Sequence, residues 1–257
     1  MRRVRVMAAT QNDPNTSERR AALVTGGSKG IGRAIAAALL ESGTHVLITG
    51  RDRASLASAA DALGAHGQPS GARVEWFAGD VRREDDARAM VDEAARRFGG
   101  LDILVNNAAV GILVETAAMT GDQWRETVET NLSGVFYCTH AAIPHLRARG
   151  GGWIINISSL ASRNPFPRGA AYSATKAGLN AFGEALMQEL RYDGIRVSTV
   201  CPGSVRTGFA GSDDGAAAHW KLAPEDVARV VVDLIAHHGR SLPSLVDIRP
   251  SMPPRKK

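Results

Sequence analysis

Cysteine is scarce in this chain of 257 residues: Cys138 and Cys201 are far apart, and both stand in apolar stretches. A secreted scaffold held by disulfides needs several cysteines at regular spacing. The seven histidines include no pair at ligand spacing from a cysteine or carboxylate. We therefore expect two reduced core thiols in a cytoplasmic protein, with neither a disulfide nor a metal site.

The sequence also lacks a run of about 18 apolar residues, the length that a membrane-spanning helix requires. Residues 1–19 are basic and polar without the apolar core of a secretory signal, and residues 251–257 are basic too. We expect both to be tails, the first a disordered native tail or a cloning remnant; Asp13 and Glu18 disfavour a transit segment. The net charge of +5 comes partly from these ends, so it does not indicate a nucleic-acid partner.

Short apolar runs alternate with longer stretches rich in alanine, leucine, glutamate and arginine. This alternation predicts one α/β domain over residues 20–250, with a doubly wound, mostly parallel seven-stranded sheet flanked by helices. The expected strands are 20–25, 45–49, 73–79, 101–106, 152–158, 195–200 and 244–248.

A glycine-rich turn, Gly26-Gly27-Ser28-Lys29-Gly30-Ile31-Gly32, separates the first expected strand from a helix-like stretch, 33–42. Glycines permit a tight turn and let backbone N–H groups approach a pyrophosphate, which the N-terminus of a helix also favours. The spacing Gly-x-x-x-Gly-x-Gly differs from the commoner Gly-x-Gly-x-x-Gly. The flanking strand and helix nevertheless predict a dinucleotide site.

A phenol and an ammonium stand four residues apart in Tyr172-Ser-Ala-Thr-Lys176, a helix-compatible run. At that spacing both side chains lie on one helix face, and a nearby cation lowers the pKa of a tyrosine. On its own the pair also fits a solvated helix surface. Upstream, the expected strand 152–158 runs into Ser159, whose hydroxyl could meet Tyr172 at the strand's end, although Ser158 and Ser159 could also be turn and capping residues.

A third apolar run ends in Asn106-Asn107-Ala108-Ala109, where small residues would let a cofactor lie against the backbone. Together these patterns resemble the short-chain dehydrogenase/reductase family, 3-oxoacyl reductase-like or generic carbonyl reductases, over residues 20 to about 208. Ala109 stands where the family usually has glycine. The landmarks that carry the resemblance are Thr25-Gly-x-x-x-Gly-x-Gly32, Asp80, Asn106-Asn-Ala-Ala109, Asn131, Ser159, Tyr172-x-x-x-Lys176, Pro202-Gly203 and Thr207.

The resemblance implies a Rossmann-type fold and hydride transfer between a nicotinamide and a carbonyl or secondary alcohol. It implies that Tyr172 is the general acid or base, that Ser159 binds the carbonyl oxygen and that Lys176 lowers the Tyr172 pKa. Asn131, within an expected helical stretch 124–146, would hold a water that links Lys176 to solvent. The cofactor-binding residues that it implies are Gly26, Ser28, Lys29, Gly30, Ile31, Gly32, Arg51, Asp80, Val81, Asn107, Ala108, Tyr172, Lys176, Pro202, Gly203, Val205 and Thr207.

Charge at the end of the second expected strand bears on the choice of cofactor. An acidic residue there would bind the ribose 2′-hydroxyl of NAD(H) and repel a 2′-phosphate. Here Gly50 takes that place and Arg51 follows, while Lys29 offers a second cation. Arg51 could also be a solvated arginine and Asp52 a helix N-cap. The sequence favours NADP(H), with NAD(H) as the alternative.

The segment after Thr207, residues 208–222, would line the substrate site, and its glycine and alanine content predicts an open or mobile pocket. Bulky candidates for substrate contact are Phe209, His219, Trp220, Phe166 and Arg163. We expect a small-molecule carbonyl or alcohol substrate, no nucleic-acid or membrane partner, and a homodimer or homotetramer. The alternative is a non-catalytic NADPH-binding sensor on the same fold.

Overall fold

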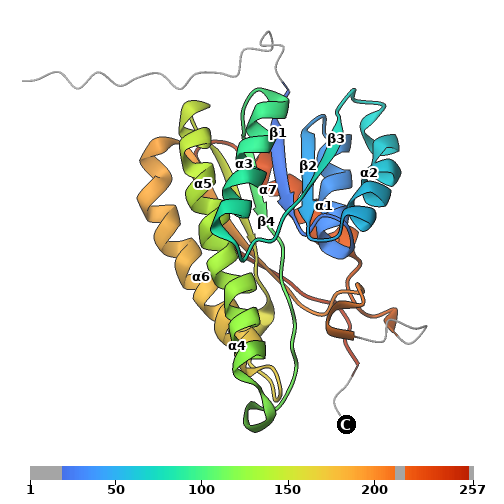
Figure 1. The fold of residues 1–257 in the computed structure, drawn as a ribbon, viewed down its shortest axis with the longest axis vertical. Helices are drawn as coiled ribbons and strands as arrows, with labels where there is room; N and C mark the ends of the chain where they lie inside the picture. Colours follow the sequence, from blue (N-terminus) through green and yellow to red (C-terminus); the bar gives the residue numbers. More distant parts are fainter. Residues whose placement is uncertain (1–18, 212–217, 255–257) are drawn as a thin grey trace, which may run out of the picture.

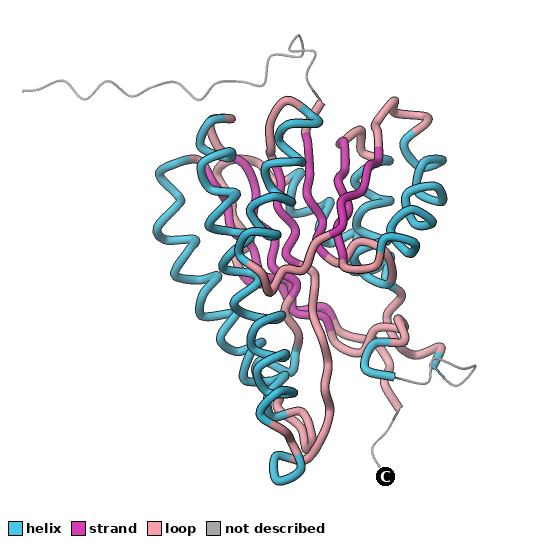
Figure 2. The backbone as a smooth tube through the Cα atoms, viewed as in Figure 1, coloured by secondary structure: helices cyan, strands magenta, loops and turns pink. Residues whose placement is uncertain are grey.

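The computed structural model describes residues 19–211 and 218–254, so nearly all of the expected N-terminal tail, the last three residues of the expected C-terminal tail and part of the 208–222 segment lie outside it. Its strands form one seven-stranded sheet in the order β3-β2-β1-β4-β5-β6-β7, and every pairing is parallel (Figures 1 and 2). The strands are β1 (Ala21–Thr25), β2 (His45–Gly50), β3 (Val74–Ala78), β4 (Ile103–Asn106), β5 (Gly152–Ile157), β6 (Ile195–Pro202) and β7 (Leu245–Ile248). The expected α/β fold is confirmed, and each expected strand is present to within two residues at either end.

Helices cover both faces of the sheet, which explains why the strands are apolar runs. Along β1, Ala22 and Val24 belong to the core beneath α1, α2 and α7, whereas Leu23 points into the core beneath α3, α5 and α6. The α-helices are α1 (Gly30–Glu41), α2 (Arg53–Gly67), α3 (Glu84–Phe98), α4 (Gly121–Val128), α5 (Gly134–Ala148), α6 (Ala170–Leu190) and α7 (Pro224–Ala236).

The order of the strands reverses beside β1. The chain runs from β1 outward to β3 and then returns to the other side of β1 with β4. In open α/β sheets, this switch point leaves a crevice at the carboxyl ends of the strands, where ligands bind. The glycine-rich turn follows β1 and the Asn107 loop follows β4, so both lie at this crevice.

The expected helical stretch 124–146 is not one helix. It is divided into α4, a wider π-helical turn (Glu129–Ser133) and α5. Such turns are frequent at functional sites, and this one contains Asn131. The expected N-cap of α2 is confirmed, since the Asp52 carboxylate accepts a hydrogen bond from the Ser55 N–H at 2.7 Å.

Cys138 and Cys201 are both buried and free, and burial raises the pKa of the Cys138 thiol to about 12. Across residues 19–211 and 218–254, no three histidine, cysteine, aspartate or glutamate side chains gather as a metal site. None of the helices described here is both long enough and apolar enough to pass through a membrane.

Candidate active site

Ser159 and Tyr172 meet at the carboxyl end of β5. Ser159 stands two residues after the end of β5 and caps a short 3₁₀-helix (Leu160–Ser162), where its hydroxyl accepts a hydrogen bond from the Ala161 N–H at 3.1 Å. Tyr172 lies in the first turn of α6, and its side chain is hydrogen-bonded to Ser159. Ser159 is thus a capping residue and a partner of the phenol at once.

Lys176 lies one turn after Tyr172 on α6, with its Nζ atom 5.8 Å from the centre of the Tyr172 ring. Its side chain is buried, and Nζ donates a hydrogen bond to the Ile157 carbonyl at 2.7 Å. Because burial disfavours the charged form, the pKa of Lys176 falls to about 8. Lys176 is thus anchored on β5 rather than exposed on a helix surface.

The pKa of Tyr172 differs from the expectation. Burial raises it above its ordinary value, and the hydrogen bond from Ser159 opposes that rise only in part. The net shift is therefore upward, although a lowered pKa was expected, and the influence of Lys176 on the phenol stays a prediction. The physical reason is that burial destabilises the charged phenolate by removing its hydration, and the hydrogen bond with Ser159 stabilises the phenolate by less.

Asn131 joins the loop after β4 to α6. Its Oδ1 accepts from the Val110 N–H at 2.8 Å, while Nδ2 donates to the Val110 carbonyl at 3.0 Å and to the Thr175 hydroxyl at 3.2 Å. The side chain is fully buried and its amide holds two elements in place beside Lys176. Nδ2 thus uses both of its hydrogens, while Oδ1 keeps a lone pair that can accept a further hydrogen bond.

The turn between β1 and α1 has the geometry of a phosphate cradle. Gly26 and Gly30 have φ values of +65° and +54°, which favour glycine, and a Cβ on Gly32 would overlap the Gly26 carbonyl and the Asn107 amide. Lys29 is the N-cap of α1 but makes no side-chain capping bond, so its side chain leaves the first N–H groups of the helix uncapped. Ser28 and Ile31 complete the turn, half-buried. This cradle fits a dinucleotide pyrophosphate.

Hydrogen bonds fasten the turn to the loop after β4. The Thr25 hydroxyl accepts from the N–H groups of Asn107 and Ala108, at 3.0 and 3.1 Å. In return, Asn107 Nδ2 donates to the carbonyls of Thr25 and Gly26, at 2.9 and 3.1 Å. Asn107 and Ala108 thus form the wall of the crevice at the switch point, and Thr25 is a supporting residue that the list of cofactor-binding candidates omitted.

The segment after β6 closes over the same turn. Gly203 donates its N–H to the Ile248 carbonyl at 2.8 Å, just after Pro202 ends the strand, and Val205 pairs with Leu222 in a short bridge. A Cβ on Gly30 would lie 3.3 Å from the Thr207 side chain. The structure therefore brings the predicted Thr207 against the predicted phosphate turn.

A cluster of charged residues lies at the carboxyl ends of β2 and β3. We call this part of the crevice the adenosine end, because the sequence predicts that the cofactor's adenosine ribose binds there. Arg82 binds the Asp80 carboxylate with two nitrogens, at 2.6 to 3.0 Å, and Arg51 lies 3.8 Å from Glu126 of α4. Burial raises the pKa of Asp80, but the Arg82 hydrogen bonds outweigh it, so the pKa is lowered overall. Val81 is buried beside them. The sequence analysis missed Arg82 and Glu126; only the Asp-x-Arg pattern after β3 could have indicated Arg82.

The Phe209 ring packs against the ring of Tyr172. Its ring centre lies 5.8 Å from that of Tyr172, and a Cβ on Gly111 would lie 2.5 Å from Phe209 Cε1. The structure thus brings Phe209, one of the predicted substrate-contact residues, to the site, while residues 212–217 of the same segment lie outside the described residues. Arg163 forms an ion pair with Asp247 of β7 instead of standing free at the site.

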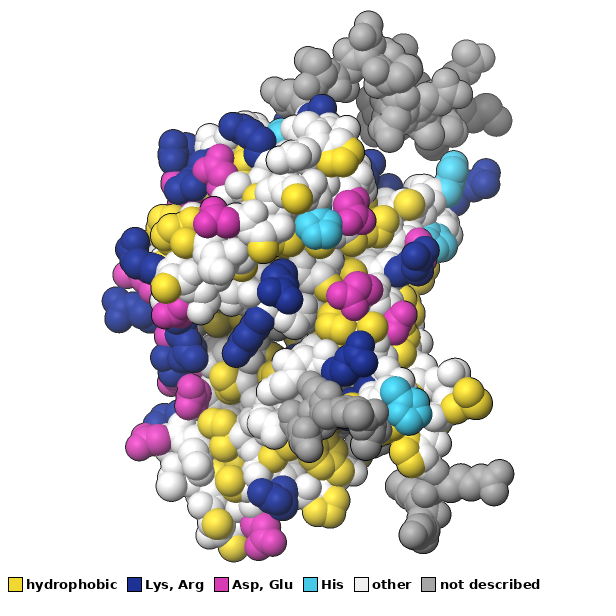
Figure 3. Space-filling model, turned by 90° about the vertical axis from the view of Figure 1, so that its right-hand side faces the viewer, with side chains coloured by type: hydrophobic (Ala, Val, Ile, Leu, Met, Phe, Trp, Pro, Cys, Tyr) yellow, Lys and Arg dark blue, Asp and Glu magenta, His cyan; other side chains and the backbone are white. Residues whose placement is uncertain are grey.

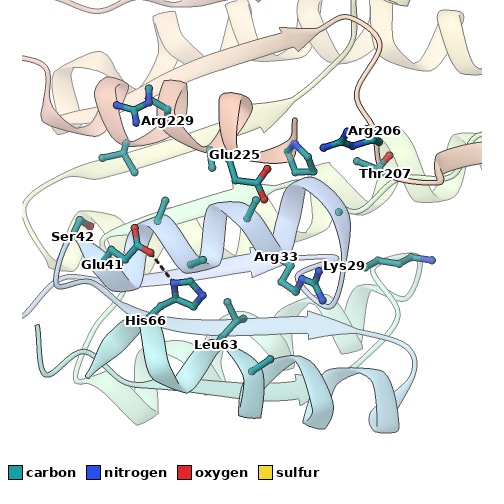
Figure 4. Close-up of a pocket in the computed structure, with 18 of the residues that line it drawn as sticks. Lys29, Arg33, Glu41, Ser42, Leu63, His66, Arg206, Thr207, Glu225 and Arg229 are labelled. Carbon is teal, nitrogen blue, oxygen red and sulfur yellow. Dashed lines mark hydrogen bonds and ion pairs between the residues drawn. The ribbon is translucent and has the colours of Figure 1, made fainter. Parts of the chain in front are cut away.

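A separate hollow of about 930 Å³ lies between α1, α2 and α7 (Figure 4). Lys29 and Thr207 are at one end of it, and a hydrogen bond between the His66 ring and the Glu41 carboxylate, at 2.7 Å, is at the other. Its lining does not include Tyr172, so it is not where the proton donor acts. On the molecular face shown in Figure 3, acidic and basic side chains are interspersed.

Comparison with known proteins identifies the class. The profile of the short chain dehydrogenase family matches residues 20–216, and the chain belongs to this family. It is accordingly an oxidoreductase that acts on alcohol or carbonyl groups with a nicotinamide cofactor. No finer branch of the family is resolved.

Individual relatives agree with this assignment. The chain is 38% identical to an uncharacterised oxidoreductase of Methylorubrum extorquens over 235 residues, 87% of this chain and 93% of the relative. An alcohol dehydrogenase from Thermococcus sibiricus, solved with 5-hydroxy-NADP, superposes with a TM-score of 0.84 at 28% identity, covering 93% of this chain and all (100%) of that one. L-sorbose reductase from Gluconobacter frateurii, solved with NADPH and L-sorbose, gives 0.83 at 28% identity, covering 91% and 97%.

Proposed function

We propose that this protein is an NADP(H)-dependent reductase of a ketone, aldehyde or 3-oxoacyl-type carbonyl, or in reverse a dehydrogenase of the corresponding alcohol. The observation that carries the proposal is the meeting of Ser159, Tyr172 and Lys176 at the carboxyl end of β5, next to a turn that fits a pyrophosphate. The bound nicotinamide would supply or accept the hydride.

In reduction, the chain's own groups hold the carbonyl and move one proton. The Ser159 hydroxyl donates a hydrogen bond to the carbonyl oxygen, where negative charge develops. The Tyr172 hydroxyl gives its proton to the same oxygen, and its raised pKa keeps it protonated at neutral pH. Lys176 borders the phenol and, when protonated, would stabilise the phenolate that remains. Asn131 keeps this part of α6 in position.

The preference for NADP(H) rests on Arg51 and Lys29, because a guanidinium and an ammonium attract a 2′-phosphate. Gly50 stands at the end of β2, where an acidic residue would repel that phosphate. The two solved relatives described above carry NADP-type cofactors, which agrees with this preference. NAD(H) remains the alternative.

The oligomer is proposed to form through α5 and α6, which lie side by side at one edge of the molecule (Figure 1). Phe136 of α5 is 48% exposed and Trp124 of α4 is 47% exposed, an amount of apolar surface that a partner copy would cover. Analytical ultracentrifugation should show a dimer or tetramer. A species of monomer mass at all concentrations would remove this proposal.

The enzymatic proposal is tested by the loss of nicotinamide absorbance with NADPH or NADH and a panel of ketones, aldehydes and 3-oxoacyl thioesters. We expect turnover with NADPH that Tyr172→Phe lacks. The rival function, a non-catalytic NADPH sensor, predicts that NADPH protects the protein against thermal unfolding although the wild type turns over no substrate. The intact Ser159, Tyr172 and Lys176 favour the enzyme, since a sensor has no need of them.

A further inference from the structure

The Glu126 carboxylate lies between two guanidinium groups at the adenosine end of the crevice. One of its oxygens is 3.8 Å from Arg51 Nη1 and 3.7 Å from Arg82 Nη1. The three side chains come from separate elements: Arg51 follows β2, Arg82 follows β3, and Glu126 belongs to α4. One carboxylate of α4 thus lies near the two arginines that follow β2 and β3.

The two arginines are held very differently. Arg82 Nε contacts both oxygens of Asp80, at 3.0 and 2.9 Å, and its Nη2 contacts one of them at 2.6 Å, so Asp80 occupies the Nε–Nη2 edge of the guanidinium and holds Arg82 in place. Arg51 is 58% exposed in its side chain, and its 3.8 Å approach to Glu126 is longer than a hydrogen bond. Of these two cations, Arg51 is therefore the one that can turn toward a new anion.

We infer that Glu126 is a specificity-determining residue that competes with the 2′-phosphate of NADP(H) for Arg51 and so limits the preference for NADP(H) over NAD(H). The inference rests on the proposed function, in which Arg51 binds that phosphate. A phosphate at Arg51 brings further negative charge near the Glu126 carboxylate, and the two anions repel each other. NAD(H) has a neutral hydroxyl at this position and does not experience that repulsion.

The test is a cofactor titration of Glu126→Gln, which keeps the shape of the side chain and removes its charge. Asp122→Asn is the matched control: it removes one charge from the same helix, where Asp122 pairs with Arg125 rather than with Arg51. We expect Glu126→Gln to bind NADPH about two- to fivefold more tightly, the range for an exposed ion pair, with NADH affinity unchanged. Asp122→Asn should leave both affinities unchanged, and high salt should shrink the gain.

Three results would overturn the inference. Weaker NADPH binding by Glu126→Gln would mean that Glu126 orients Arg51 for the phosphate instead of competing for it. Equal changes for NADPH and NADH would mean an effect on the shape of the crevice, and an unchanged NADPH affinity would mean no competition. A parallel titration of Arg51→Ala shows whether the inference about Glu126 fails alone or together with the proposed function. If Arg51→Ala binds NADPH as tightly as the wild type, Arg51 does not bind the 2′-phosphate, and the assignment of Arg51 itself is wrong.

Discussion

The two ends of the crevice are built by different forces. At the catalytic end, Lys176 and Asn131 are at most 3% exposed and are held by short hydrogen bonds to backbone atoms. At the adenosine end, Arg51 and Glu126 are partly exposed and are held by longer ion pairs. A buried polar group without its partner costs far more than an exposed ion pair contributes, so the catalytic end has one arrangement and the adenosine end can adjust.

The largest effect is expected at the catalytic end, from a matched pair of serines. Ser159→Ala should reduce kcat about 10²- to 10³-fold, because the carbonyl oxygen loses a hydrogen-bond donor as its charge develops. The hydroxyl of Ser158, the preceding residue, instead has two acceptors for its single proton, Asn180 Oδ1 at 2.6 Å and the Lys176 carbonyl at 3.2 Å. Ser158→Ala should therefore lower the free energy of unfolding by about 1–3 kcal/mol.

Steady-state kinetics and urea unfolding of both serine variants distinguish the two roles. If Ser159→Ala loses stability but keeps its kcat, Ser159 is only the cap of its 3₁₀-helix.

The next effect comes from the buried ammonium of Lys176, whose pKa is about 8 in the folded protein against an ordinary 10.5. Between these two values the unfolded chain binds more protons than the folded one, so stability rises with pH. In the protein without cofactor, the free energy of unfolding should increase by on the order of 2 kcal/mol from pH 8 to 10.5 through this group. The slope from this group fades as the pH falls below 8 and is lost about one pH unit lower.

Urea unfolding across this pH range, for the wild type and for Lys176→Met, isolates the contribution. The difference between the two proteins should grow with pH in favour of the wild type. Parallel curves would show that Lys176 keeps its ordinary pKa when buried.

The smallest effect is expected at the adenosine end. Arg82→Ala removes the clamp on Asp80, which is partly exposed, and should lower the free energy of unfolding by about 1 kcal/mol or less, with a smaller loss in high salt. The pKa of Asp80 should rise, because burial is then opposed by fewer hydrogen bonds, and NMR titration of the carboxyl carbon can follow it. A loss as large as that of Ser158→Ala would contradict the contrast between the two ends.

This contrast also explains how much the sequence could predict. The five inner strands of the sheet were visible because they are apolar runs buried on both faces, whereas the edge strands β3 and β7 are only partly buried. The turn from Gly26 to Gly32 was visible because its backbone needs glycine. Glu126 could not be found, since nothing local marks a glutamate that meets an arginine 75 positions away. The same limit applies to the ring contact of Phe209 with Tyr172 and to the pKa of Tyr172, because both depend on what tertiary packing places around the phenol.

The most direct test of the account is to measure NADPH affinity and turnover on one preparation of Tyr172→Phe. The phenol hydroxyl is assigned to proton transfer at the catalytic end, while the glycine-rich turn and the Arg51 region are assigned most of the cofactor's binding. The account predicts that turnover falls at least about 10²-fold while the Kd for NADPH changes little. Turnover close to that of the wild type, with NADPH still bound, would contradict it.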